Sequence, residues 1–119
     1  MARTISFQQA LSANQNVDQQ SGVNNSEFNP LASTSKVSLY AAATVVGTGG
    51  RGAMVSLKLG ADIQASDIVC PVASAVSTRD HLVASGIGLR GQKITVPIRN
   101  EGTATPTVNG YVVIEPLGR

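Results

Sequence analysis

From Lys36 onward, short apolar segments alternate with glycine-bearing turns. The alternation is clearest in 55–59 and 93–99, where Leu and Ile face one side while Ser, Lys, Thr and Arg face the other. Six such segments at this spacing predict a mainly β protein, an antiparallel sheet with hairpins and little helix. The expected strands are Lys36–Val46, Ala53–Leu59, Ile68–Val76, Leu82–Leu89, Gln92–Arg99 and Thr107–Glu115.

Three local features modify this pattern. Pro97 has no amide donor, which predicts that its strand lies at an edge or is interrupted there. The segment 62–67 has the composition of a helical turn. The segment 73–83 is ambiguous, because Ser77 or Thr78 can cap a short helix there.

Residues 1–35 differ from the rest of the chain. Gln, Asn and Ser dominate them, and their apolar residues are too sparse to bury a face, which predicts a polar N-terminal arm or irregular segment. A strand at 3–7 and a short helix at 7–11 are the local alternatives. The expected organisation is therefore an arm over 1–35 and a β-sheet domain over 36–119.

Composition limits what this domain can be. Hydrophobic residues make up 42% of the 119-residue chain, but aromatic residues only 3%, and Trp is absent, so the core consists of small side chains. Charged residues make up 13%, about half of the roughly 25% usual in soluble domains. Low charge suits a surface covered by partners, first of all other copies of the chain. The N-terminus lacks the apolar core of a signal peptide, and no apolar run reaches the roughly 18 residues of a spanning helix, so we expect cytoplasmic assembly without a membrane partner.

Candidate chemistry is sparse. One Cys, Cys70, and one His cannot form a disulfide or supply a zinc site, so we expect no metal and no cofactor. The glycines of 47–52 match a dinucleotide-binding outline, but the strand-like segment 53–59 follows where a helix is needed, and a hairpin loop is the better interpretation. Asp80 and His81 are adjacent and would point to opposite faces of a strand. We expect neither catalytic residues nor a small-molecule substrate.

The basic residues belong to the sheet. Residues 1–35 carry a net charge of −1, whereas 36–119 carry eight basic and five acidic groups. A polar sheet face with lysine, arginine and hydroxyl groups can bind phosphates and 2′-hydroxyls, and a tyrosine can stack on a base. A solvated surface is the equally weighted alternative. The candidate RNA-binding residues are Lys36, Ser38, Tyr40, Ser56, Lys58, Lys93, Thr95 and Arg99.

Four segments together carry a family resemblance. Residues 36–40, 54–59, 67–70 and 92–96 resemble the central sheet of the coat proteins of single-stranded RNA bacteriophages. The resemblance implies a viral capsid protein that dimerises through sheet edges and assembles into an icosahedral shell in the virion. It also implies that an inner sheet face packages viral single-stranded RNA. Carried over by position, Ser56 and Lys58 would face the RNA, with Lys36, Ser38 and Lys93.

The C-terminal region departs from that family. Such coat proteins end in two helices that clasp the partner subunit, whereas residues 103–110 here form a turn that leads into a strand over 111–116. A terminal hairpin of 93–99 with 107–115 would have to replace the clasp by pairing across subunits. The same ending resembles jelly-roll phage proteins. The alternative function is therefore a capsid decoration or minor virion protein, which has no need of a basic sheet face.

Overall fold

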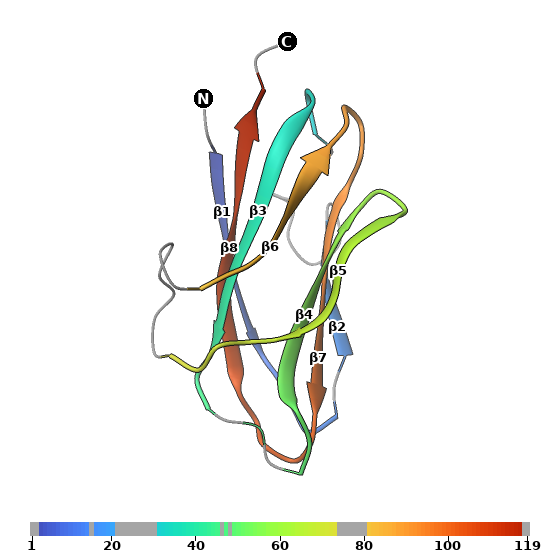
Figure 1. The fold of residues 1–119 in the computed structure, drawn as a ribbon. Helices are drawn as coiled ribbons and strands as arrows, with labels where there is room; N and C mark the ends of the chain where they lie inside the picture. The colour runs from blue at the N-terminus through green and yellow to red at the C-terminus, as the bar shows by residue number, and fades with distance from the viewer. Residues whose placement is uncertain are drawn as a thin grey trace.

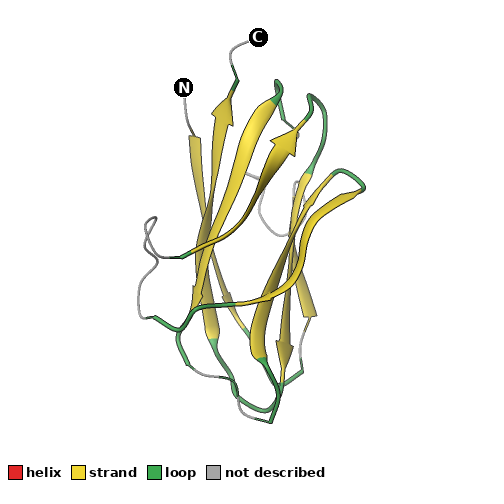
Figure 2. Ribbon diagram, viewed as in Figure 1, coloured by secondary structure: helices red, strands yellow, loops and turns green. Residues whose placement is uncertain are grey.

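The computed structural model describes residues 3–14, 16–20, 31–45, 47, 49–73 and 81–117. These residues form eight strands and no helix (Figures 1 and 2). The mainly β prediction is thereby confirmed, and no described helix is long and apolar enough to cross a membrane. The strands are β1 (Arg3–Ala10), β2 (Asn16–Gln20), β3 (Ser35–Ala43), β4 (Gly52–Leu59), β5 (Asp62–Val69), β6 (Leu82–Gly88), β7 (Ile94–Glu101) and β8 (Thr107–Pro116).

The strands build two four-stranded antiparallel sheets that face each other (Figure 1). The first sheet has the order β1-β8-β3-β6 and the second the order β2-β7-β4-β5. β1 pairs with β8, β2 with β7, β3 with β6 and β4 with β5, so the first half of the chain pairs antiparallel with the second half. Alternate pairs lie in opposite sheets. This is the winding of an eight-stranded jelly roll.

The core lies between the two sheets and follows the predicted alternation. In β7, Ile94, Val96 and Ile98 are buried, while the residues between them are half-buried on the outer face. In β3, Val37 and Leu39 point inward in the same way. The strands predicted in these regions are confirmed, with ends shifted by a few residues at most, because one apolar face was enough to identify each of them.

Residues 3–20 contribute two strands where an arm or irregular segment was expected. β1 pairs with β8 over its whole length, and β2 pairs with β7. Ile5 and Phe7 are buried in the core and alternate with exposed Thr4 and Ser6. Two apolar residues on one face are sufficient to form a strand here, because β8 supplies hydrogen-bond partners for the backbone of β1. The local alternative of a strand at 3–7 is therefore confirmed, and the helix at 7–11 is wrong.

The segment 62–67 is part of β5 and not a helical turn. Gly60, at φ 64°, reverses the chain after β4, and β5 then returns antiparallel to β4. The pairing is irregular, with two register shifts, and Asp67 lies in the left-handed region at φ 51°. The strand expected over 68–76 ends at Val69. The possible helix near Ser77 lies outside the described residues.

Pro97 lies in an interior strand, so its predicted edge position is wrong. β7 runs between β2 and β4. The pairing of β4 with β7 is nevertheless interrupted at Ser56 and Leu57, which lie opposite Pro97 and Val96. On either side of this gap the strands pair in the same register. The missing donor of proline is accommodated by this gap.

Two expected hairpins are crossings between sheets. The glycine loop after β3 leads from the first sheet to β4 in the second, and β7 and β8 also lie in different sheets. Gly47 and Gly52 approach so closely that a Cβ on Gly47 would lie 2.5 Å from the Cα of Gly52, and Gly52 has φ 79°. The glycines therefore permit a tight crossing. The segments that carry the resemblance to RNA phage coat proteins are likewise divided between the two sheets.

Candidate nucleic-acid interface

The eight candidate residues lie on two opposite outer faces of the sandwich. Lys36, Ser38 and Tyr40 alternate with core residues of β3, which places them on the outer face of the first sheet. The residues of β4 and β7 lie on the outer face of the second sheet, with Lys93 just before β7. The structure therefore does not bring the eight residues together. Packing two apolar faces against each other forces the polar faces to point apart.

On the second sheet, two lysines are close neighbours. Lys58 of β4 lies opposite Thr95 of β7, and the Gly60 amide donates to the Lys93 carbonyl (2.9 Å). In this register Lys93 is the diagonal neighbour of Lys58 on the same face, a relationship that spans roughly 7–8 Å. Lys58 is half-buried and Lys93 is exposed. Like charges at this spacing can contact adjacent phosphates of a nucleic-acid backbone.

Arg90, three residues before Lys93, is a further exposed cation and was not among the predicted residues. It is exposed in the turn between β6 and β7, next to Gly91. The Gly91 amide donates to the Leu31 carbonyl (2.8 Å), so this turn is held by the segment that precedes β3. The only signal in the sequence was a cation in a short turn, which is common on any surface. We call Lys58, Arg90 and Lys93 the basic cluster.

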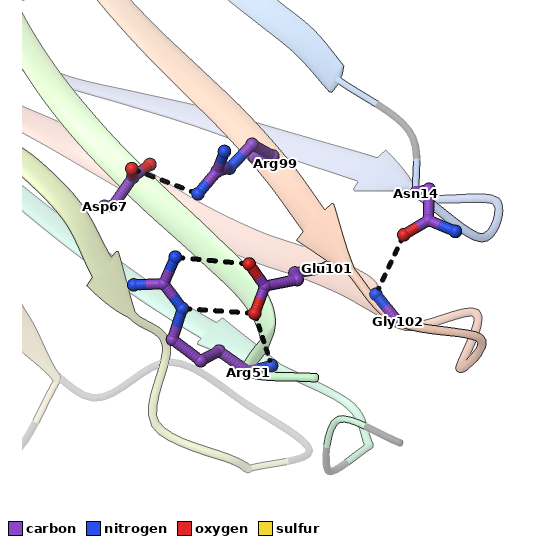
Figure 3. A network of polar contacts seen from close by, with 6 residues as sticks. All are labelled: Asn14, Arg51, Asp67, Arg99, Glu101 and Gly102. Carbon is purple, nitrogen blue, oxygen red and sulfur yellow. Dashed lines mark hydrogen bonds and ion pairs between the residues drawn. The ribbon is translucent and has the colours of Figure 1, made fainter. Parts of the chain in front are cut away.

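Arg99, by contrast, is engaged by an acid. Its Nη2 donates to Asp67 Oδ2 (3.1 Å), an ion pair in which both side chains are about 40% exposed (Figure 3). The Asp67 amide donates to the Ser56 hydroxyl (2.9 Å), and Ser56 is only 9% exposed. Ser56 and Arg99 thus fix the irregular course of β5 against β4. Their role in the described residues is structural.

On the first-sheet face, the candidate residues lie beside an acidic or aromatic neighbour or are buried. Lys36 lies directly opposite Glu115 in the pairing of β3 with β8, and Ser38 is only 4% exposed. Tyr40 stacks on Tyr111, with ring centroids 5.2 Å apart and an interplanar angle of 29°. Opposite charges across the strands and a stacked tyrosine pair stabilise a sheet surface.

A shallow depression lies beside this tyrosine pair. It is lined by Ser6, Phe7, Gln8, Asn109, Gly110 and Tyr111. Phe7 faces Gly110 across β1 and β8, and a Cβ on Gly110 would lie 2.5 Å from the Phe7 ring. The glycine therefore makes room for the ring. The lining of the depression contains no titratable side chain besides Tyr111.

A second polar network lies near the Arg99–Asp67 pair, at the end of the sandwich where β7 ends and β4 begins (Figure 3). Arg51 contacts both carboxylate oxygens of Glu101 at 3.2 Å, and its amide donates to the same carboxylate (3.0 Å) (Figure 3). These hydrogen bonds hold the pKa of Glu101 below its usual value and raise that of Arg51. The Gly102 amide donates to the Asn14 side-chain oxygen (3.1 Å). The network ties three loops together.

Asn100 anchors this end from the inside. It is 1% exposed, and its Nδ2 donates to the carbonyls of Ser12 (2.9 Å) and Ala104 (2.7 Å). Its Oδ1 has no hydrogen-bond partner in the structure. A buried amide that satisfies two loop carbonyls is a structural element, since each unsatisfied carbonyl would be costly.

Of the groups considered for catalysis, the structure describes Cys70 and His81. Cys70 is 4% exposed, and burial raises the pKa of its thiol to about 12, so it is a packing residue rather than a nucleophile. The His81 backbone carbonyl accepts a hydrogen bond from the Ala41 amide (3.1 Å) where β6 begins. Asp80 lies outside the described residues. Within the described part of the chain, no three His, Cys, Asp or Glu side chains gather as metal ligands would.

Comparison of the chain with protein-family models, with curated proteins and with solved structures gave no match. Function is therefore inferred from the physical arrangement of the surface residues.

Proposed function

We propose that this chain is a structural protein of a virion, a coat protein that associates with copies of itself to form a shell. The observation that supports this proposal is the eight-stranded jelly roll, an architecture used by viral capsid domains. The same architecture is also used by lectin domains and cupins. The scarcity of charge, 13% of the chain, favours a surface that is covered in an assembly.

The basic cluster supports the second part of the proposal, that the shell packages single-stranded RNA. Lys58 and Lys93 share the outer face of the second sheet, and neither takes part in an ion pair among the described residues. Phosphate contacts of this kind give sequence-independent affinity that falls with salt. We propose that the second-sheet face turns toward the shell interior and contacts the nucleic-acid backbone.

A capsid decoration or minor virion protein is the second candidate. It is favoured by the ion pair of Arg99 with Asp67 and by the position of Glu115 opposite Lys36, which reduce the positive charge on the two outer faces. Such a protein would bind an existing shell and carry no RNA.

The test is to express the chain alone and separate it by size exclusion with absorbance at 260 and 280 nm. Two Tyr and no Trp make the protein a weak absorber at 280 nm, so packaged RNA dominates the spectrum. We expect regular shells with a nucleic-acid spectrum in negative stain. Small RNA-free oligomers would refute the coat assignment and favour the decoration protein.

Lys58→Ala tests the RNA-binding face. We expect intact particles with a lower ratio of absorbance at 260 to 280 nm and a weaker dependence of RNA retention on salt. Lys36→Ala is the matched control, since Lys36 lies on the opposite face of the sandwich. Equal RNA content in both variants and the wild type would remove the basic cluster from the proposal.

A further inference from the structure

One narrow side of the sandwich is formed by two edge strands. β6 is the last strand of the first sheet and β5 the last strand of the second, and the two run past each other on the same side (Figure 1). They do not pair with each other. β6 pairs only with β3, so the backbone groups along its other side have no strand partner in the described residues.

This side is apolar where an edge would ordinarily be protected. Leu82 and Ile87 of β6 are each 51% exposed, Leu89 just beyond is 57% exposed, and Ile63 of β5 is 63% exposed. β6 contains no charged residue and no proline. Soluble proteins usually blunt an edge strand with charges or proline, because unpaired strands invite further pairing. We call residues 62–69 and 82–93 the β5–β6 surface.

The opposite narrow side provides a comparison within the same molecule. β1 is the edge strand of the first sheet there. Its outward positions are Thr4, Ser6, Gln8 and Ala10, and it exposes no large apolar side chain. Of the two edge strands of the first sheet, β6 therefore exposes large apolar side chains and β1 does not.

We infer that the β5–β6 surface binds a second copy of this chain, with the two β6 strands paired antiparallel about a two-fold axis at Ser85. The inference rests on the proposed self-association and names the surface that carries it. Such a contact joins the first sheets of two copies into one continuous sheet. It also satisfies backbone donors and acceptors that the monomer leaves to water.

The sequence of β6 fits a copy of itself. In an antiparallel pair centred on Ser85, Ala84 lies opposite Gly86 of the second copy and Val83 opposite Ile87. Every position of the strand then meets an uncharged residue of the second copy. The smallest residues, 84–86, lie at the centre of the contact, next to the two-fold axis. A two-fold contact requires this kind of self-complementarity, because the same patch supplies both halves.

The size of the surface also fits a homodimer. The β5–β6 surface comprises twenty residues, and stable interfaces use about 20–30 residues on each side. Among the nearby charges, Lys36 lies on β3, opposite Ile87 and one strand away from the contact. Asp67 is tied to Arg99, and Asp62, Arg90 and Lys93 lie beyond the ends of β6, where they would form a polar rim.

Sedimentation velocity over a concentration series tests this inference, on full-length nuclease-treated protein at high salt to exclude association through RNA. We expect Ile87→Lys to weaken self-association at least tenfold, because it buries an unpaired charge in the contact. Gln8→Lys is the matched control on the exposed edge strand β1 and should associate like the wild type. Circular dichroism verifies that both variants are folded.

A disulfide trap tests the register independently. Facing residues of antiparallel strands have Cα atoms roughly 4.5–5.5 Å apart, which a disulfide can span. Ser85→Cys should therefore give a covalent dimer on mild oxidation, whereas Gln8→Cys should not; the native Cys70 is buried in both.

The outcomes separate this inference from the proposed function. If the wild type associates but Ile87→Lys associates equally and Ser85→Cys remains uncrosslinked, the surface assignment is wrong and self-association stands. A wild type that stays monomeric at all concentrations overturns both.

Discussion

Replacing Asn100 by Asp should make stability depend on pH in the direction opposite to ordinary acid unfolding. The native amide donates two hydrogen bonds, to the Ser12 and Ala104 carbonyls, at 1% exposure. An ionised carboxylate has no hydrogen to donate, so both carbonyls lose their partner. Each buried unsatisfied acceptor costs about 1–3 kcal/mol. At pH 7 we expect a loss of ~4 kcal/mol from a total that is typically about 5–15 kcal/mol.

The sign with pH follows from the same geometry. Burial and two facing carbonyl oxygens disfavour the charged form, so the pKa of the new carboxyl is raised in the folded state above its unfolded value of about 3.9. Folding is therefore favoured below the unfolded pKa, where a protonated carboxyl still donates one hydrogen bond. The advantage is lost as the pH rises through the folded pKa.

Urea unfolding followed by far-ultraviolet circular dichroism measures this effect. Relative to the wild type, Asn100→Asp should be much less stable at pH 7 and recover part of the difference at pH 4, with an unchanged dependence on urea. Asn109→Asp makes the same chemical change at a half-buried position on the outer face and should be nearly neutral. Equal stability of the two variants at pH 7 would refute the role given to Asn100.

Two further predictions concern the other titrating groups. Glu101→Gln should lessen the stability that is lost as the pH falls below about 4.5, because the Arg51 hydrogen bonds lower the folded pKa of Glu101 and stop contributing once this carboxylate is protonated. Unfolding midpoints at pH 7 and pH 3 measure this difference, and an acid response equal to that of the wild type would contradict the prediction. Cys70 should not react with a chromogenic thiol reagent at pH 8 in the folded chain and should react fully in urea, since burial raises the pKa of its thiol to about 12. Rapid labelling of the folded chain would contradict this and would show that the end of β5 opens.

Sequence reasoning located five of the six strands it proposed, because each has one apolar face. It failed where the apolar signal was short. Ile5 and Phe7 alone define the inner face of β1, and a Gln- and Ser-rich context concealed them. It also misread 62–67 as a helical turn, because β5 is an edge strand with exposed residues on both faces and therefore shows no clear alternation.

The candidate site was predicted only in part. Alternation correctly put Lys58 and Thr95 on the polar face of their strands. It could not reveal that Asp67 pairs with Arg99, since the two residues are 32 positions apart and meet only through the pairing of β4 with both neighbours. Arg90 lies in the turn between β6 and β7, where a single cation gives no signal in the sequence.

The sequence by itself determined that this chain is a β protein with small core residues and which face of each main strand is apolar, because a period of two is a local property of the backbone. Only the tertiary structure decided which strands share a sheet. That choice depends on pairings between the first and second halves of the chain, which no local pattern records. It separated the predicted polar face into two opposite faces, engaged Arg99 with an acid, and left β6 as the uncharged edge on which self-association can be tested.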